Sequence, residues 1–218
     1  MLVAIDGPAG SGKSSVARVV AGELGVVDLN TGAAYRAVAL LALEEAVDLD
    51  DGASLAEVSR RVSLDGGGAL VDGEPVPEEQ LRTPKVSAAA SRVSARPEVR
   101  EILLQVQREA AGRALEQGGA VVEGRDIGTV VLPEADLKIY LLAAPEERAR
   151  RRAHQTGREE ELERIREAMT KRDRQDSERT TSPLKPAPDA VVLDTTALSL
   201  DEVVARVLEL AHGLRKGA

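Results

Sequence analysis

Short apolar runs alternate along the whole chain with longer segments whose apolar residues recur at helical spacing. The apolar runs predict buried strands at residues 2–5, 25–29, 120–123, 137–142 and 190–193. The other segments predict helices at residues 14–24, 33–45, 54–61, 83–95, 97–117, 145–179 and 200–214, the sixth interrupted near Thr156 and Gly157. Strands that alternate with helices predict an α/β fold, in which helices cover both faces of a parallel sheet.

Residues 62–79 depart from this pattern, because short alternating stretches are separated there by Asp-Gly turns at residues 65–68 and 72–73. An Asp-Gly pair between alternating residues is a strong hairpin signal. We therefore expect a small antiparallel β insertion. Thr31 is expected to be the N-cap of the helix at residues 33–45.

The charge balance restricts the possible partners, since 37 acidic and 29 basic residues leave a net charge of −8. An acidic chain has no overall attraction for nucleic acid. The absence of cysteine, with only two histidines, excludes thiolate and histidine-cluster metal sites. No apolar run approaches membrane-spanning length. The sequence thus predicts a cytoplasmic protein that binds neither nucleic acid nor membrane.

A glycine-rich stretch joins the first predicted strand to the first predicted helix; it consists of Gly7, Pro8, Ala9, Gly10, Ser11, Gly12, Lys13, Ser14 and Ser15. Glycines let successive backbone N–H groups converge on an anion, and the following helix N-terminus favours phosphate. In such a loop the lysine reaches the terminal phosphates and the next hydroxyl can ligate Mg²⁺. This stretch predicts binding of a nucleoside triphosphate.

Three further groups of residues carry candidate chemistry near predicted strand ends. Tyr35 and Arg36 lie one turn into a helix, where an arginine can bind phosphate bidentately, although a capped helix with a core tyrosine explains them equally well. Arg125 and Asp126 follow a buried strand, where they could contact phosphate, Mg²⁺ or a base, or form a surface ion pair.

The third group lies in a charged helical stretch. Arg172, Asp176 and Arg179 share one helix face, which suits a phosphate and a neighbouring hydroxyl. Charged residues between 148 and 166 are instead interpreted as a solvated face with Glu–Arg pairs.

Together these motifs resemble the bacterial cytidylate kinases of the nucleoside monophosphate kinase superfamily. The resemblance spans nearly the whole chain, and the segment 124–129 with the preceding β insertion is its most specific part. It implies a P-loop kinase fold with a five-stranded parallel sheet in the order 2-3-1-4-5. It also implies one domain over residues 1–218, a monophosphate-binding region at 31–100 and a helical lid at 148–182. Asn30 departs from the family, which commonly has Asp at this position.

The resemblance implies transfer of the ATP γ-phosphoryl group to CMP or dCMP by a monomer that uses Mg²⁺. Its implied catalytic residues are Lys13, Arg125, Arg172 and Arg179. ATP would be bound by residues 7–15 and by Arg151 on the lid, with Ser14 on the metal. CMP would be bound by Thr31, Tyr35, Arg36, Ser91, Arg100, Arg125, Asp126, Arg172, Asp176 and Arg179.

Three alternatives remain to be weighed against this assignment. The nearest is a P-loop kinase for another acceptor, such as UMP, AMP or shikimate. A GTP-switch protein would need an Asn-Lys-x-Asp motif, which cannot occur because Asn30 is the only asparagine. A nucleotide-dependent nucleic-acid-binding protein is disfavoured by the acidic balance and by the scarcity of stacking aromatic residues.

Overall fold

A computed structural model describes residues 1–66 and 68–217. In this part of the chain the main sheet has five strands in the order β2-β6-β1-β7-β8. The strands are β1 (Leu2–Asp6), β2 (Val27–Asn30), β6 (Ala120–Glu123), β7 (Leu137–Leu142) and β8 (Val191–Asp194). When the three inserted strands are left out of the numbering, this is the predicted order 2-3-1-4-5. The α/β fold with a parallel sheet is confirmed.

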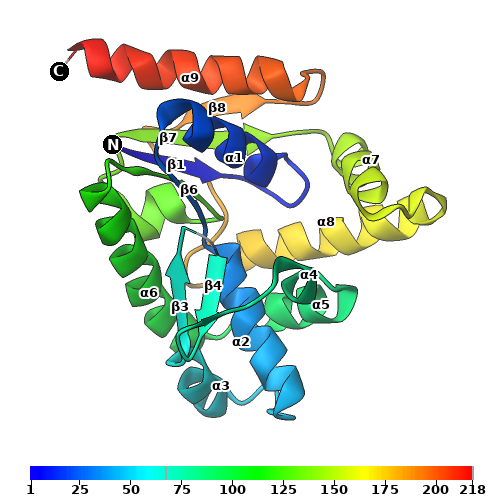
Figure 1. The fold of residues 1–218 in the computed structure, drawn as a ribbon. Helices are drawn as coiled ribbons and strands as arrows, with labels where there is room; N and C mark the ends of the chain where they lie inside the picture. Colours follow the sequence, from blue (N-terminus) through cyan, green and yellow to red (C-terminus); the bar gives the residue numbers. More distant parts are fainter. Residues whose placement is uncertain (67, 218) are drawn as a thin grey trace. The chain divides into compact units, whose positions relative to one another are not determined.

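The chain divides into two compact units, Met1–Gly25 with Glu123–Ala218, and Val26–Val122. In the first unit, β7 pairs in parallel with both β1 and β8, and Ile139 lies opposite Ile5 and Val191. Helices α1 (Lys13–Leu24) and α9 (Leu200–Gly217) pack against each other, and α9 also contacts β7 (Figure 1). Their buried positions repeat at helical spacing, as the apolar pattern predicts.

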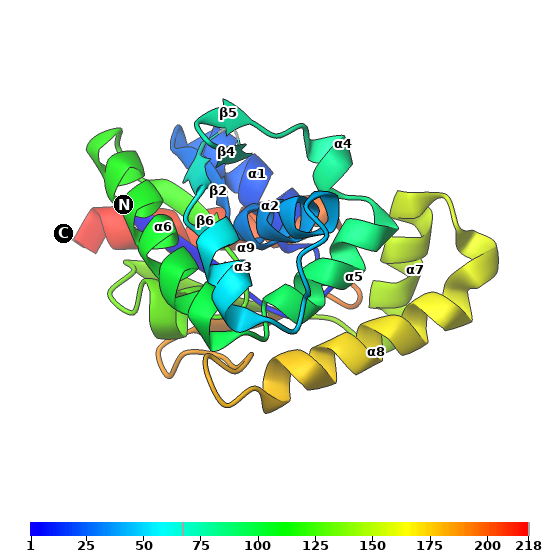
Figure 2. The same cartoon turned by 90° about the horizontal axis from the view of Figure 1, so that it is seen from below.

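The first unit also contains a pair of helices, α7 (Pro145–Thr156) and α8 (Leu162–Glu178), joined by the short 3₁₀ turn η2 (Glu159–Glu161) (Figures 1 and 2). Helix α7 ends where Gly157 adopts a left-handed conformation at φ 62°, so the predicted interruption is confirmed. An apolar cluster of Ala149, Ala153 and Ile165, with Met169 packed against it, holds the two helices together. No helix in the described residues is long and apolar enough to cross a membrane.

The second unit is mainly helical, and α2 packs against α5 while α3 packs against α6 (Figure 2). Its helices are α2 (Gly32–Glu44), α3 (Gly52–Ser59), α4 (Glu78–Leu81), α5 (Pro84–Val93) and α6 (Pro97–Glu116). The predicted insertion is the antiparallel sheet of β3 (Val62–Asp65), β4 (Gly68–Val71) and β5 (Glu74–Pro75). Gly67, in the first predicted turn, lies outside the described residues.

Two local predictions in the second unit need correction. Thr31 occupies the N-cap position of α2, but its backbone is helical and its side chain does not cap the helix. A side-chain cap of this kind is found at another helix, α5, where Thr83 Oγ1 accepts a hydrogen bond from the Val86 N–H at 3.2 Å. Helix α4 was not predicted, because four residues are too few to show a helical period. The boundaries 31–100 and 148–182, and the assignment of one domain, stay predictions.

Candidate functional site

The predicted phosphate loop runs from the end of β1 to the start of α1, so the order of strand, turn and helix is confirmed. Gly7, Gly10 and Gly12 have positive φ angles of 148°, 73° and 93°. A Cβ atom on Gly7 would lie only 2.3 Å from the Leu141 carbonyl oxygen. The loop can therefore pass this close to β7 only with glycine at its first position.

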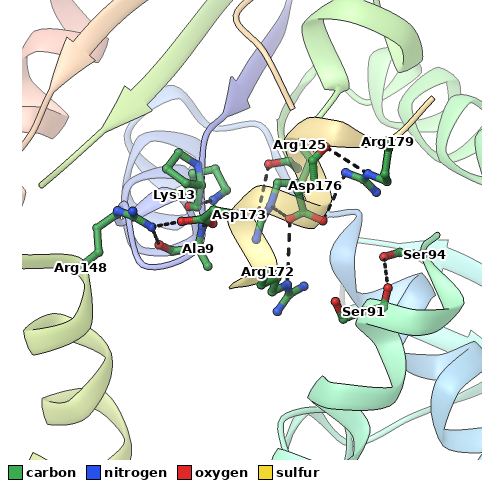
Figure 3. A network of polar contacts seen from close by, with 12 residues as sticks. Ala9, Lys13, Ser91, Ser94, Arg125, Arg148, Arg172, Asp173, Asp176 and Arg179 are labelled. Carbon is green, nitrogen blue, oxygen red and sulfur yellow. Dashed lines mark hydrogen bonds and ion pairs between the residues drawn. The ribbon is translucent and has the colours of Figure 1, made fainter. Parts of the chain in front are cut away.

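Lys13 is buried at the start of α1, and its Nζ donates a hydrogen bond to the Pro8 carbonyl oxygen at 2.8 Å. Burial lowers its pKa well below the usual value, and the nearby Arg125 guanidinium acts in the same direction. The ammonium group is thus held inside the loop by the loop's own backbone (Figure 3).

Asp6, the last residue of β1, connects the phosphate loop to the segment after β6. Its two carboxylate oxygens accept hydrogen bonds from the Ile127 and Gly128 N–H groups, at 2.9 and 2.8 Å. Burial raises its pKa to about 6, although these two hydrogen bonds act in the opposite direction. The sequence analysis gave Asp6 no role in the site. Its position, between an apolar strand and a glycine-rich loop, was the available signal.

The Arg125–Asp126 pair is followed by a π-helical turn, η1 (Ile127–Val131), which the sequence pattern does not predict. Its i→i+5 hydrogen bonds run from the Val131 N–H to the Asp126 carbonyl oxygen and from the Leu132 N–H to the Ile127 carbonyl oxygen, at 3.1 and 2.7 Å. Such turns occur frequently at functional sites. The Asp126 side chain is buried next to this turn.

Asp176 on α8 gathers three arginines around one buried carboxylate (Figure 3). Its oxygens lie 3.0 Å from Arg125 Nε, 3.4 Å from Arg179 Nη2 and 4.0 Å from Arg172 Nε. Burial opposes ionisation of this carboxyl group, but the three guanidinium groups outweigh it and hold its pKa below the usual value. Arg172 and Asp176 share one face of α8 as predicted, but the helix ends at Glu178, and Arg179 follows it with an extended backbone at ψ 136°. Arg179 therefore reaches Asp176 from beyond the helix, and Arg125 joins them from a segment 51 residues away.

The like charges in this arginine group also affect one another. Burial, together with the Arg125 guanidinium, lowers the pKa of Arg172 to about 10. Arg172 nevertheless stays charged at neutral pH. The arrangement therefore presents concentrated positive charge that an anion can neutralise.

Arg151 on α7 is held at the end of β8. Its Nη1 donates to Thr195 Oγ1 at 3.0 Å, its Nη2 donates to the Thr195 carbonyl oxygen at 2.5 Å, and its Nε donates to Glu147 at 3.0 Å. Thr195 Oγ1 in turn donates to the Leu142 carbonyl oxygen at 2.9 Å. Arg151 is thus fixed at the carboxyl edge of the sheet; its role in ATP binding stays a prediction.

In the second unit, the predicted CMP residue Arg100 contacts Tyr35 directly and is linked to Ser91 through Ser94. The Arg100 guanidinium carbon lies 5.6 Å from the Tyr35 ring centre, within cation–π range. Arg100 Nη1 also donates to the Ser94 carbonyl oxygen at 3.3 Å, and Ser94 Oγ donates to the Ser91 carbonyl oxygen at 3.0 Å (Figure 3). Gln107, which the sequence analysis missed, approaches the Tyr35 hydroxyl at 3.5 Å.

The two remaining CMP candidates of this unit lie at the start of α2. Thr31 is buried, and Arg36 is half-exposed. The Arg36 side chain passes close to Gly32, because its Nη1 would lie 3.3 Å from a Cβ atom placed on that glycine. Asn30 Oδ1 lies 3.2 Å from that same position. The residue that departs from the family pattern is therefore a neighbour of these candidates.

The prediction of a solvated face between residues 148 and 166 holds for several Glu–Arg pairs but is wrong for Arg148. Exposed pairs join Glu163 to Arg166 and Glu161 to Arg164. Only 8% of the Arg148 side chain is exposed, and it forms an ion pair with Asp173. Partners that lie far away in the sequence explain this burial, and helical spacing alone could not reveal them.

The side chains near the phosphate loop fit a metal ion that takes most of its oxygen ligands from bound phosphates and water rather than from the protein. Among the described residues, no group of three or more carboxylate or histidine side chains could hold a metal ion. Ser14 is half-exposed in the first turn of α1, where its hydroxyl could supply one oxygen ligand. Such a donor set suits Mg²⁺, which keeps several water ligands and is usually bound by one or two protein groups together with substrate phosphates.

Comparison with known proteins gives consistent matches. A family model described as cytidylate kinase matches residues 3–213. A cytidylate kinase of Exiguobacterium sibiricum is 46% identical over 222 residues, covering 98% of each chain. One of Caldanaerobacter subterraneus subsp. tengcongensis is 48% identical over 220 residues, covering 99% of this chain and 96% of that protein. An uncharacterized protein from Eubacterium ventriosum, only 12% identical, shares the fold with a TM-score of 0.53 over 96% of this chain and 97% of its own.

Proposed function

The chain belongs to the cytidylate kinase family, and from that premise we propose that it transfers the γ-phosphoryl group of ATP to CMP or dCMP, giving CDP or dCDP and ADP. The structural observation that supports this reaction best is the group of Arg125, Arg172 and Arg179 around Asp176. It lies in the same compact unit as the phosphate loop. Phosphoryl transfer between two anions needs such a concentration of fixed positive charge.

On the donor side, we propose that residues 7–15 bind the triphosphate of ATP. A glycine-rich loop that leads into a helix N-terminus, as here before α1, favours phosphate. Lys13 would exchange its hydrogen bond to the Pro8 carbonyl for one to a phosphate oxygen. Arg151, fixed by Thr195 at the sheet edge, would contact ATP from the lid side.

On the acceptor side, Arg125 and Arg179, with Arg36 of the second unit, would bind and neutralise the CMP phosphate. Asp176 would orient the arginines and, together with Arg172, contact the sugar. An oxygen of the CMP phosphate attacks the γ-phosphorus in line, the bond to the ADP oxygen breaks, and the phosphoryl group moves to CMP. Since the attacking oxygen is already anionic, no general base is required. Catalysis then consists of positioning and charge neutralisation.

Recognition of cytosine would be carried by Asp126, Ser91 and Arg100, with Thr31 and Tyr35 lining the monophosphate side. Cytosine presents a donor amine beside an acceptor nitrogen, which a carboxylate and an arginine complement. Uracil has a carbonyl in place of the amine, so it would face Asp126 unfavourably. Mismatched buried polar groups of this kind discriminate by up to about 10⁴.

Mg²⁺ would be held by Ser14 together with the ATP phosphates and water. When bound, the ion neutralises charge that develops on the phosphates. Residues 148–182 would act as a lid that excludes water and so prevents wasteful hydrolysis of ATP. We also propose that the enzyme works as a monomer in the cytoplasm, which multi-angle light scattering of the purified protein and microscopy of a tagged chain would test.

An acceptor panel tests the proposed function directly. Purified protein with MgATP is offered CMP, dCMP, UMP, AMP and shikimate, and ADP production is measured for each. We expect CMP and dCMP to be the preferred acceptors. Preference for UMP, AMP or shikimate, or ADP release that no acceptor increases, would reject the proposal.

The Asp126→Ala variant tests the recognition of the base in the same assay. Without the carboxylate we expect a smaller ratio of kcat/KM for CMP over UMP, because the partner of the cytosine amine is lost. An unchanged ratio would place base recognition elsewhere.

A further inference from the structure

The backbone of Ala9, in the middle of the phosphate loop, is held on both sides by residues of the helix pair α7 and α8. Arg148 Nη1 on α7 donates a hydrogen bond to the Ala9 carbonyl oxygen at 3.0 Å. The Ala9 N–H donates to Asp173 Oδ1 on α8 at 3.2 Å. Arg148 and Asp173 also form an ion pair with each other, which closes a ring of three contacts (Figure 3).

Both side chains are well placed to hold the loop firmly. Their exposed fractions are 8% for Arg148 and 16% for Asp173, so water screens the pair only weakly. Arg148 Nε donates to the Ala143 carbonyl oxygen at 3.0 Å, which fixes the guanidinium plane. These contacts span 25 to 164 residues of sequence, so they are features of the folded unit rather than of one helix.

Gly10, the next loop residue, is enclosed by the same two helices. A Cβ atom there would lie 2.6 Å from Met169 Cε on α8 and 2.9 Å from the Arg148 carbonyl oxygen on α7. Met169 in turn packs on the apolar cluster that joins the two helices. A methyl group at position 10 would therefore not fit between α7 and α8 as they are packed here.

We propose that Arg148 and Asp173 are positioning residues that fix the Ala9 peptide and thereby orient the phosphate loop for ATP. This inference rests on the proposed function and extends it, since neither residue was among the ATP-binding candidates. An anion nest binds well only if its N–H groups already converge before the ligand arrives. Rotation of the peptide at Ala9 would turn the following N–H groups of the loop away from one another. The ring of contacts prevents this rotation and makes the loop's shape depend on the packing of α7 against α8.

The geometry allows one competing interpretation with the opposite consequence. The Asp173 carboxylate is an anion that accepts a hydrogen bond from an N–H of an anion-binding loop. If it occupied a place that a phosphate oxygen needs, its removal would strengthen ATP binding. If it positions the loop, its removal weakens ATP binding. The sign of the change in ATP affinity therefore separates the two.

The experiment compares Arg148→Met, Asp173→Ala and the double variant with the wild-type enzyme. The dissociation constant of MgATP is measured by isothermal titration calorimetry, and KM is measured for ATP and for CMP. A hydrogen bond to a charged group contributes enough that we expect MgATP affinity to fall about 10- to 100-fold in each single variant. We expect the double variant to resemble the single ones, because the two residues act as one unit. KM for CMP should change less than about threefold, since its arginines are left in place.

Two further variants separate positioning from a general loss of stability. Asp173→Asn retains an acceptor for the Ala9 N–H but loses the charge, so its loss of ATP affinity should be smaller than that of Asp173→Ala. Arg174→Gln breaks an exposed ion pair with Glu178 on the same helix and should leave ATP affinity unchanged. Circular dichroism at the assay temperature establishes that each variant is folded; if Asp173→Ala is not, the comparison rests on Asp173→Asn.

The outcomes are distinct. A wild-type enzyme that does not phosphorylate CMP would refute the proposed function. With an active wild type, unchanged MgATP affinity in the folded variants would overturn the positioning role, and so would tighter MgATP binding. Equal increases in KM for ATP and for CMP would also overturn it, because they would indicate a general disturbance of the enzyme.

Discussion

Replacing Asp176 by Asn is the most direct perturbation of the arginine group. The amide has nearly the same shape as the carboxylate but carries no charge. Arg125, Arg172 and Arg179 would then face one another without the anion that now lies between them. We expect the variant to be markedly less stable than the wild type, and unusually responsive to added anions.

The size of the effect follows from the three distances. At 3.0, 3.4 and 4.0 Å, each pair is worth about 4 to 6 kcal/mol at an effective dielectric constant of ~20. Loss of hydration of the buried charges offsets most of this attraction. Breaking a buried pair by removing one partner costs about 3–5 kcal/mol in measured cases. For a chain of this size, a loss of about 3 kcal/mol lowers Tm by roughly 6–12 °C.

Thermal unfolding with and without inorganic phosphate measures both parts of the prediction. Phosphate supplies the missing negative charge, so the same phosphate concentration should raise Tm more in Asp176→Asn than in the wild type. Glu178→Gln is the matched control, because Glu178 pairs with Arg174 on the exposed face of the same helix. Its Tm should change little, since exposed pairs contribute at most about 1 kcal/mol.

Two results would refute this reasoning. A wild-type Tm in Asp176→Asn would mean that the three arginines do not need the carboxylate. An equal response to phosphate in both proteins would mean that the arginine group is not an anion site.

Three further predictions concern other parts of the site. Arg179→Ala should lower kcat by about 10³ or more with only a small change in Tm, because two arginines still pair with Asp176; steady-state kinetics with an unchanged kcat would remove this residue from the mechanism. Gly10→Ala should destabilise the fold by about 1–3 kcal/mol in urea unfolding, because its Cβ would meet the Arg148 carbonyl oxygen at 2.9 Å and its φ is positive; wild-type stability would contradict the packing described. Burial raises the pKa of Asp6 to about 6, so the native state keeps a proton that the unfolded chain releases near pH 4. The free energy of unfolding should therefore fall by about 3 kcal/mol through this group as pH rises from ~4 to ~6. In urea unfolding at several pH values, Asp6→Asn should lack this part of the pH dependence.

Local rules of sequence were sufficient for much of the fold. The strand, glycine loop and helix at the N-terminus follow from an apolar run, positive-φ glycines and helical spacing. The helix break at Gly157 and the antiparallel insertion follow from a left-handed cap and from Asp-Gly turns. The shared face of Arg172 and Asp176 follows from the helical period alone, whereas the extended backbone at Arg179 does not.

Contacts between distant segments could not be predicted in the same way. Arg148 lies on a highly charged helix, a pattern that predicts a solvated side chain, yet its partners are 25 and 139 residues away. Asp6 gains its role only because η1 is brought to the end of β1. The π-helical turn itself has no sequence period that would distinguish it from a loop.

The hydrogen bond between Lys13 and the Pro8 carbonyl has a consequence for how nucleotide affinity should be understood. The ammonium already has a neutral partner in the Pro8 carbonyl oxygen, so contact with a phosphate replaces one interaction by another rather than adding a new one. The contribution of Lys13 to ATP affinity is then only the difference between its interactions with the two partners. During transfer, negative charge shifts among the phosphate oxygens, and the Pro8 carbonyl is then a poorer partner for the ammonium than these oxygens are. Lys13 would therefore contribute more to the rate than to ground-state binding.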